Sequence, residues 1–192
     1  MVERPPPPSD DASSIVLGGH QVAFGSHLCA FYDSDAGRLR LSVPFLAEGL
    51  RSGQPCFLFA KGRVLDSYLA ALRGCPGVDV RRALRNGALV VADGPGTTTR
   101  AALDFLESTL WSALDRNATF VRGVGEMVSE REQFTSEREM LTYESMLNAT
   151  IKRFPCVVIC QYDVRQFSGQ AVFEAMRAHP DVLAAPGRFF LK

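Results

Sequence analysis

The sequence predicts an α/β protein with a doubly wound, mainly parallel sheet. Short apolar runs rich in Val, Phe, Ile and Cys alternate along the chain with longer amphipathic stretches. Strands that alternate with helices in this way require right-handed crossover connections, because parallel neighbours cannot be joined by a tight turn. The runs are largely apolar throughout, which is typical of strands that helices cover on both faces.

The predicted elements follow one another closely along the chain. Strands are expected at residues 27–32, 55–60, 88–93, 119–127 and 155–163. Helices are expected at residues 36–53, 64–74, 97–117, 136–154 and 168–180, and Gly53 and Gly74 stand where two of them should stop. Val78–Val80 and the segment RFFLK (188–192) are predicted to add short edge strands. The charged run SEREQFTSERE (129–139) is predicted to be a solvated connection or a mobile lid.

Length and composition indicate one globular domain in the cytoplasm. The 192 residues suffice for one sizeable core, so residues 15–192 are predicted to form a single domain and the proline-rich residues 1–14 a disordered tail. A formal net charge of zero, without a basic block among aromatics, argues against direct binding of nucleic acid. The chain shows no secretory signal and no apolar stretch long enough to span a membrane. The 5 cysteines form no CxxC pair, which favours reduced thiols.

A nucleotide hydrolase of RecA-like architecture is the obvious enzymatic alternative. It would need the phosphate-binding sequence GxxxxGK[ST] after its first strand. At that position the chain reads FYDSDAGRLRLS, without the lysine, and Asp33 and Asp35 would repel phosphates. The sequence therefore predicts no ATP hydrolysis, no catalytic residue and no cofactor.

Polar residues that follow the apolar runs are the candidate binding residues, because ligands of doubly wound sheets bind beyond the carboxyl ends of the strands. Tyr32 ends the first run, Glu126 follows two glycines in VRGVGEM, and Tyr162 and Asp163 close PCVVICQYD. Glu126 has no evident nucleophile or metal partner, so we interpret it as a polar anchor for a ligand and not as a catalyst. For Asp163, the ordinary alternative is a cap of the next helix.

His27 and Cys29 stand two residues apart, so on a strand both side chains point to one face and could share a soft metal ion. Cys156 and Cys160 also share a face, and a His/Cys cluster would form if their strand were the neighbour of the first. Structural zinc sites usually contain a tight CxxC pair, however, and cysteine is common in buried cores. The preferred interpretation is a buried histidine with inert thiols and no metal.

Taken together, the motifs resemble those of the MEDS domain, the methanogen/methylotroph, DcmR-type sensory domain. The resemblance rests on HLCAFYDS, PFLAEGLRSGQPCFLF, GALVV, FVRGVGEM, YESMLN and CQYDVRQFSGQAVFEAMRAHPDVL, which span residues 27–183. It implies a RecA-like fold that has lost its phosphate-binding loop, in agreement with the missing lysine. It also implies prokaryotic signal transduction or transcription regulation, through the sensing of small molecules such as simple hydrocarbon derivatives.

The resemblance further implies which residues form the ligand site. The family's characteristic polar residues fall on His27, Cys29, Tyr32, Glu126, Tyr162, Asp163 and His179. Of these, His179 precedes Pro180 at a predicted helix end, where the helix dipole alone would also favour a histidine. Family members are often fused to histidine kinase, sigma-factor antagonist or helix-turn-helix modules. A chain of 192 residues leaves no length for such a module beside the sensory domain. Its output is therefore expected to pass through a protein partner or through homo-oligomerisation.

The leading hypothesis is a non-catalytic, cytoplasmic sensor that binds a small molecule and acts through a regulatory partner of the kinase, anti-sigma or antagonist type. Two alternatives stay open at this point. One is a degenerate RecA-like protein that still binds nucleotide or hydrolyses ATP, with Glu126 positioning the water. The other is a protein-interaction module whose pocket is vestigial.

Overall fold

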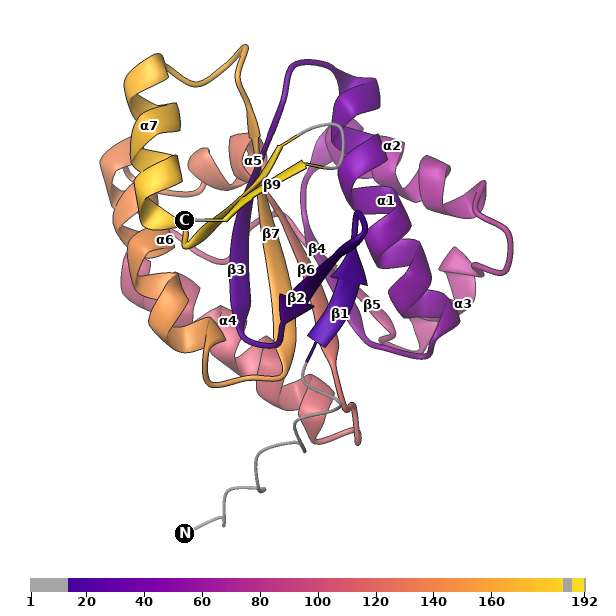
Figure 1. The fold of residues 1–192 in the computed structure, drawn as a ribbon. Helices are drawn as coiled ribbons and strands as arrows, with labels where there is room; N and C mark the ends of the chain where they lie inside the picture. The colour runs from indigo at the N-terminus through magenta and orange to yellow at the C-terminus, as the bar shows by residue number, and fades with distance from the viewer. Residues whose placement is uncertain (1–13, 185–187, 192) are drawn as a thin grey trace, which may run out of the picture.

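The computed structural model describes residues 14–184 and 188–191, which form a sheet between two layers of helices (Figure 1). The 7-stranded sheet has the order β5-β4-β6-β7-β3-β8-β9. All neighbouring strands in it are parallel except β8 and β9. The predicted doubly wound, mainly parallel α/β fold is confirmed.

The five predicted strands of the main sheet are all present. They are β3 (Ser26–Tyr32), β4 (Cys56–Phe59), β5 (Leu89–Ala92), β6 (Val121–Glu126) and β7 (Cys156–Asp163). β7 lies at the centre of the sheet, and every one of its residues is buried. Its neighbours are β3 and β6, so that Cys29 lies opposite Cys160 and Glu126 lies opposite Gln161. The strand with Cys160 is therefore the neighbour of the strand with His27.

The helices divide between the two faces of the sheet, as Figure 1 shows on its right and left. One face is covered by α1 (Asp35–Arg51), α2 (Gly62–Arg73) and α3 (Val80–Arg85). The other face is covered by α4 (Thr99–Leu114), α5 (Met127–Arg131), α6 (Glu137–Ile151) and α7 (Gly169–Ala178). Each face has its own apolar core, with Ile159 of β7 on the α1 side and Val158 on the α6 side.

Local sequence signals explain where these helices begin and end. Side-chain oxygens of Ser34, Thr98, Ser136 and Ser168 accept the first free backbone N–H groups of α1, α4, α6 and α7. Gly74 caps the end of α2, and Gly53, with a φ of 70°, follows the end of α1. Both predicted helix stops are confirmed. Glycine is favoured at position 53 because other residues rarely adopt a positive φ.

The edges of the structure differ from the sequence expectations. An unexpected two-stranded hairpin, β1 (Ser14–Leu17) and β2 (His20–Ala23), precedes β3, which remains the first buried strand. The predicted edge strand at residues 78–80 is wrong, because the Asp79 side chain accepts the Arg82 N–H and starts α3. An unexpected strand, β8 (Asp181–Ala184), pairs with β3, and the predicted strand in RFFLK is present as β9 (Arg188–Leu191).

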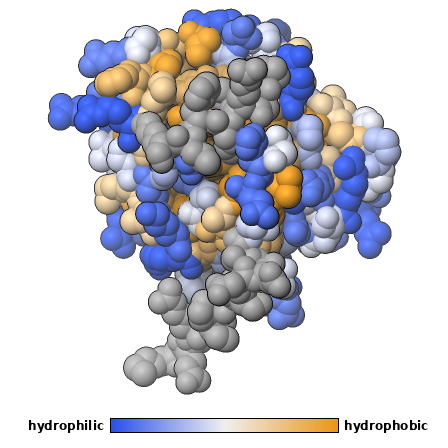
Figure 2. Space-filling view, viewed as in Figure 1, coloured by the Kyte–Doolittle hydropathy of each residue, from blue (hydrophilic) through white to orange (hydrophobic). Residues whose placement is uncertain are grey.

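Two further expectations concern the tail and the charged run. Residues 1–13 of the predicted tail lie outside the described residues, and Ser14 opens β1. The charged run 129–139 is not a wholly solvated connection, because Ser129 and Glu130 are buried within α5. The surface seen in Figure 2 intersperses hydrophilic and hydrophobic residues. In the described part of the chain, no helix has the length and apolar character that a membrane span requires.

Candidate functional site

Buried polar side chains form two clusters, one on each face of the sheet. Successive residues of a strand point to opposite faces, so Cys160 and Tyr162 of β7 enter the α6 side while Gln161 and Asp163 enter the α1 side. We name the two groups by position. The carboxyl-edge cluster on the α1 side comprises Tyr32, Arg38, Tyr68, Glu126 and Gln161. The helix-face cluster on the α6 side comprises His27, Glu144, Cys160, Tyr162 and His179.

The carboxyl-edge cluster is a hydrogen-bonded network at the ends of β3, β6 and β7. The Tyr32 hydroxyl donates to Glu126 Oε1 at 2.7 Å, and the Tyr68 hydroxyl donates to Gln161 Oε1 at 2.6 Å. Tyr68 Oη also lies 3.5 Å from Glu126 Oε2, which joins the two pairs. Gln161 Nε2 donates to the backbone carbonyl of Arg38 and thereby ties β7 to α1.

Arg38 places a buried positive charge beside this network. Its guanidinium carbon lies 5.8 Å from the ring centre of Tyr32 and 5.5 Å from that of Tyr68. Its Nη2 donates to Ser67 Oγ and its Nη1 to Asp35 Oδ1. Its Nε is buried without a hydrogen-bond partner, which leaves one donor of the cluster unused.

Glu126 is the carboxyl group of this cluster, and its pKa lies near neutral pH. Burial raises its pKa from 4.5 to about 7, although the hydrogen bond from Tyr32 and the charge of Arg38 partly oppose the change. Its side chain is therefore divided between charged and neutral forms near neutral pH. A group of this kind can respond to small changes in its surroundings.

An ion-pair bridge spans the outer end of the same edge. Arg165, in the loop after β7, donates to Asp163 through Nε and Nη2, and Nη2 also lies 3.1 Å from Asp35 Oδ1 at the start of α1. Asp163 also accepts the backbone N–H of Arg165 and thereby fixes the conformation of the loop after β7. The cap of the following helix is Ser168 and not Asp163. Burial opposes ionisation of Asp163, but the hydrogen bonds from Arg165 outweigh it and lower the pKa. The bridge joins α1 to the loop after β7.

The helix-face cluster brings together residues from four separate segments. His27 Nε2 of β3 lies 3.2 Å from Cys160 Sγ and 3.7 Å from Glu144 Oε2. His179, which ends α7, has its Nε2 2.9 Å from the same Glu144 oxygen, and the two imidazole rings are 4.0 Å apart. The Tyr162 hydroxyl donates to Glu144 Oε2 at 2.9 Å. His27, Glu144, Cys160 and His179 are each at most 2% exposed.

Burial controls the protonation of this second cluster. It lowers the pKa of His27 to about 3, with the neighbouring His179 acting in the same direction, so His27 is neutral at ordinary pH. Burial opposes ionisation of Glu144, but the hydrogen bond and charge of His179, together with the hydrogen bond from Tyr162, outweigh it and lower the pKa of that carboxyl. Close by, burial raises the pKa of Glu130 well above its usual range, and its Oε2 has no hydrogen-bond partner.

The structure divides the predicted site residues instead of collecting them in one crevice. His27, Cys29, Tyr162 and His179 belong to the α6 side, whereas Tyr32, Glu126 and Asp163 belong to the α1 side. The sheet separates the two sets. His27 and Cys29 do share a face, as predicted, but the thiol beside the His27 ring is that of Cys160.

Sequence reasoning missed several members of both clusters. Arg38, Tyr68 and Gln161 escaped notice because their partners come from α1, α2 and β7, which only the fold brings together. Glu144 did carry a signal, since it interrupts the apolar stripe of Met140, Tyr143, Leu147 and Ile151 on a predicted helix. A charge on such a stripe must find a partner when it is buried.

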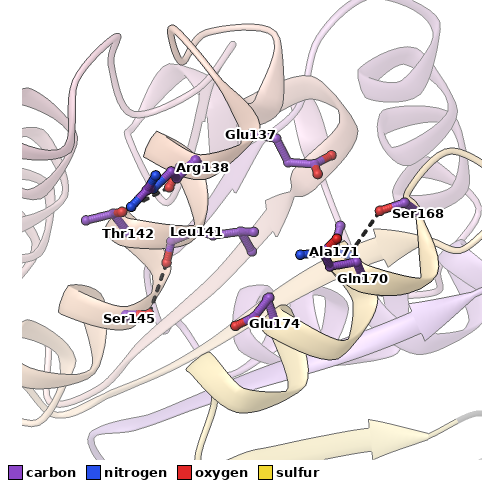
Figure 3. Close-up of a pocket in the computed structure, with 9 residues that line it drawn as sticks. All are labelled: Glu137, Arg138, Leu141, Thr142, Ser145, Ser168, Gln170, Ala171 and Glu174. Atoms are coloured by element: carbon purple, nitrogen blue, oxygen red, sulfur yellow. Dashed lines mark hydrogen bonds between the residues drawn. The ribbon is translucent and has the colours of Figure 1, made fainter.

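A surface cavity of about 540 Å³ lies between α6 and α7 and contains none of the predicted site residues (Figure 3). Its lining is polar and charged, and the residues are Glu137, Arg138, Leu141, Thr142, Ser145, Ser168, Gln170, Ala171 and Glu174. It opens between the two helices that carry Glu144 and end at His179.

The position that would hold phosphate in a RecA-like nucleotide hydrolase is filled differently here. Ser34 caps α1 by accepting the Gly37 N–H, and Asp35 occupies the first turn. A free helix N-terminus attracts anions, but these groups satisfy the N–H and place negative charge there. Both features make the start of α1 less attractive to an anion.

Fold and site together define a RecA-like α/β domain without a phosphate-binding loop. A KaiC-like protein from the hyperthermophilic archaeon Pyrococcus horikoshii OT3 matches 92% of this chain and 77% of its own, with a TM-score of 0.64 and 15% identity. An uncharacterised P. horikoshii protein, solved with an unknown peptide, matches 86% of this chain and 79% of its own, with a TM-score of 0.65 and 17% identity. These likenesses show the fold alone.

Comparison with sequence families gives the family. The model of MEDS, the methanogen/methylotroph, DcmR sensory domain, matches residues 26–180. The transcriptional repressor DcmR of Methylorubrum extorquens (strain DSM 6343 / CIP 106787 / DM4) is 36% identical over 181 residues, which cover 93% of this chain and 67% of the repressor. The chain belongs to the MEDS family, and both findings support a role in signalling and regulation.

Proposed function

We propose that this domain senses a small, neutral or weakly polar molecule at the carboxyl-edge cluster and reports its presence to a regulatory protein partner. One observation carries the proposal. Tyr32, Glu126 and Gln161 form a buried polar network at the ends of three adjacent strands. This is the place where doubly wound sheets bind their ligands.

The chemistry of the cluster favours a molecule with one or two hydrogen-bonding groups. Two phenol hydroxyls, an amide and a carboxyl group can fix its orientation, while the apolar core beneath supplies contact area. A phosphate-bearing ligand is disfavoured, because Asp35 and the Ser34 cap occupy the start of α1. Simple hydrocarbon derivatives such as short alcohols, aldehydes and amines meet these requirements.

Binding requires the cluster to open, since its members are at most 5% exposed. The bridge from Arg165 to Asp35 and Asp163 is the outermost connection between α1 and the loop after β7. We infer that it separates in the state that admits ligand. A sensor needs such a second state, because a ligand shifts an equilibrium only through different affinities for the two forms.

The proposed regulatory output is based on membership of the MEDS family. DcmR is named a transcriptional repressor, and the aligned segment covers 67% of its length. We infer that the domain alters the activity of a transcription regulator through protein contact and not through catalysis. The Ser34 cap and the acidic start of α1 support this choice over the ATPase alternative.

A binding experiment with two matched variants tests the site. The full chain is titrated by calorimetry with C1 and C2 alcohols, aldehydes, amines and halomethanes, and with Mg-ATP. Tyr32→Phe and Tyr162→Phe each remove one buried phenol hydroxyl that donates to a glutamate, but on opposite faces of the sheet. We expect Tyr32→Phe to weaken binding at least about tenfold and Tyr162→Phe to leave it unchanged, in line with the loss of a hydrogen bond to a charged group.

Three results would contradict the proposal. Equal affinity of both variants for a bound probe would refute the placement of the site. Binding of Mg-ATP alone would favour a degenerate nucleotide-binding protein. A partner recovered from cells with equal yield by the wild type and by both variants, together with no bound probe, would favour a pure interaction module.

A further inference from the structure

The helix-face cluster has the composition and arrangement of a metal centre. His27, Glu144, Cys160 and His179 each offer one ligand atom, and the four atoms lie within 4.8 Å of one another. We propose that these residues bind one divalent transition-metal ion, with Zn²⁺ as the best match. The proposal concerns the α6 face and does not depend on a ligand at the carboxyl edge.

Both imidazole rings are held in the orientation that a metal ligand needs. Asn148 uses its amide N–H groups on the carbonyls of Ala178 and Ser145, so its Oδ1 accepts from His27 Nδ1 at 3.0 Å. His179 Nδ1 donates to the Ala175 carbonyl at 2.7 Å. Each Nδ1 therefore carries the proton, which leaves both Nε2 lone pairs directed into the cluster. Metal-binding histidines are usually fixed in this way by an acceptor on the far nitrogen.

The second ring nitrogen of His179 is an independent sign of a missing partner. Nε2 is fully buried, and in a neutral ring with its proton on Nδ1 it finds no donor, because it faces the Glu144 carboxylate at 2.9 Å. A buried polar atom without a partner is costly, and a metal ion is one of the few groups that would satisfy it. The competing arrangement is a protonated His179 that forms an ion pair with Glu144, and a bound metal ion would replace that proton.

The spacing of the ligand atoms suits a tetrahedral ion. Bonds of about 2.0–2.3 Å from Zn²⁺ to N, O and S place neighbouring ligand atoms about 3.3–3.8 Å apart. His27 Nε2 lies 3.2 Å from Cys160 Sγ and 3.7 Å from Glu144 Oε2, and Cys160 Sγ lies 3.7 Å from Glu144 Oε1. The contact of 2.9 Å between His179 and Glu144 must widen, and the Glu144 carboxylate must present one oxygen to the ion, since Cys160 lies near Oε1 and both histidines near Oε2.

Charge balance favours the same conclusion. A thiolate and a carboxylate together neutralise a divalent cation, and the two imidazoles add no charge. A neutral complex is the form that a site of at most 2% exposure can hold at low cost. The mixture of one sulfur, two nitrogens and one oxygen selects Zn²⁺ over Mg²⁺ or Ca²⁺, which prefer oxygen alone.

A metal at this place would join parts of the chain that are distant in sequence. His27 belongs to β3, Cys160 to β7, Glu144 to α6 and His179 to the junction of α7 with β8. With four protein ligands, the site has no open position for a substrate, so the ion would fasten the α6–α7 layer to the sheet.

Cobalt substitution provides the test. The full chain is freed of metal with a chelator and titrated with Co²⁺, whose thiolate charge-transfer and d–d bands report tetrahedral sulfur coordination. We expect one equivalent to bind and Zn²⁺ to displace it. At a free Zn²⁺ concentration a hundred times its Kd, the melting temperature should rise by about 5–10 °C.

Matched variants distinguish this site from other thiols and from a metal-free hydrogen-bond cluster. Cys160→Ser and His179→Gln should each weaken Co²⁺ binding at least a hundredfold, and Cys160→Ser should remove the charge-transfer band. Cys156→Ser, a buried cysteine on the same strand and face, should retain both. If Cys160→Ser does not fold, His179→Gln decides by the same affinity criterion. Absence of Co²⁺ bands in the wild type, or their survival in both ligand variants, would overturn the proposal.

Discussion

Replacement of Glu126 by glutamine should change how the stability of this protein depends on pH. Glu126 is fully buried at the end of β6 and accepts a hydrogen bond of 2.7 Å from Tyr32. Glutamine has nearly the same shape and can still accept that hydrogen bond, but it cannot ionise. The substitution leaves in place every charged or titratable group that affects the ionisation of Glu126. These groups are Tyr32 of β3, Arg38 of α1, Tyr68 of α2, Glu130 of α5 and Asp163 of β7.

The size and sign of the effect follow from the pKa. In the folded protein the pKa of Glu126 is about 7, compared with 4.5 for an exposed glutamate. Between these values the folded state binds more protons than the unfolded state, so the free energy of unfolding falls as the pH rises. A pKa difference of this size lowers the free energy of unfolding by about 3 kcal/mol, at 1.36 kcal/mol per pH unit. This destabilisation is complete above the folded pKa and absent below the unfolded pKa.

Chemical denaturation of both proteins at several pH values from about 4.5 to 8 measures the effect. The wild type should lose about 3 kcal/mol relative to Glu126→Gln across this range, because contributions from unchanged groups cancel in the difference. The glutamine variant should therefore be the more stable protein at the alkaline end. A difference between the two proteins that does not vary with pH would refute the assignment of a raised pKa to Glu126.

Three further changes have predicted costs in the free energy of unfolding, each measured by denaturation at constant pH. Gly123→Ala should destabilise the protein by about 1–3 kcal/mol, because the added Cβ would overlap the ring of Phe57. An unchanged stability would contradict this and show that the core adjusts around the new methyl group. Tyr68→Phe should cost about 1–3 kcal/mol by leaving the buried Gln161 Oε1 without its donor, and a neutral effect would mean that water replaces the hydroxyl. Ser34→Ala should cost about 1 kcal/mol through loss of the α1 cap, whereas Ser34→Thr should cost less, and equal losses would contradict the capping role.

The strands that could be predicted from the sequence are those that are buried on both faces. β7 is the clearest case, since all its residues are buried and its sequence is almost continuously apolar. The β1–β2 hairpin was missed because each of its strands has only 4 residues and most of these residues are exposed, which leaves a short and weak apolar pattern. Its turn did carry a signal, because Gly18 and Gly19 form a Gly-Gly pair with positive φ angles of 59° and 85°.

The candidate site was harder to predict than the fold. Residue types and strand ends identified Glu126 and Tyr32, which do contact each other. The expectation of one common crevice overlooked strand alternation, since Tyr162 and Asp163 are adjacent in β7 and must face opposite ways. The pairing of His27 with Glu144 could not be predicted, because it depends on the position of α6 along the sheet.

The central position of β7 has a consequence for communication within the molecule. Cys160 and Gln161 share a peptide bond, yet one lies in the helix-face cluster and the other in the carboxyl-edge cluster. If this segment of main chain shifts, both side chains move with it, which offers a direct route between the two faces through the strand itself. Any free energy of coupling between the two faces acts equally in both directions. If a molecule at one cluster moves β7 and thereby changes the affinity of the other cluster for its ligand, that ligand must change the affinity of the first cluster by the same factor.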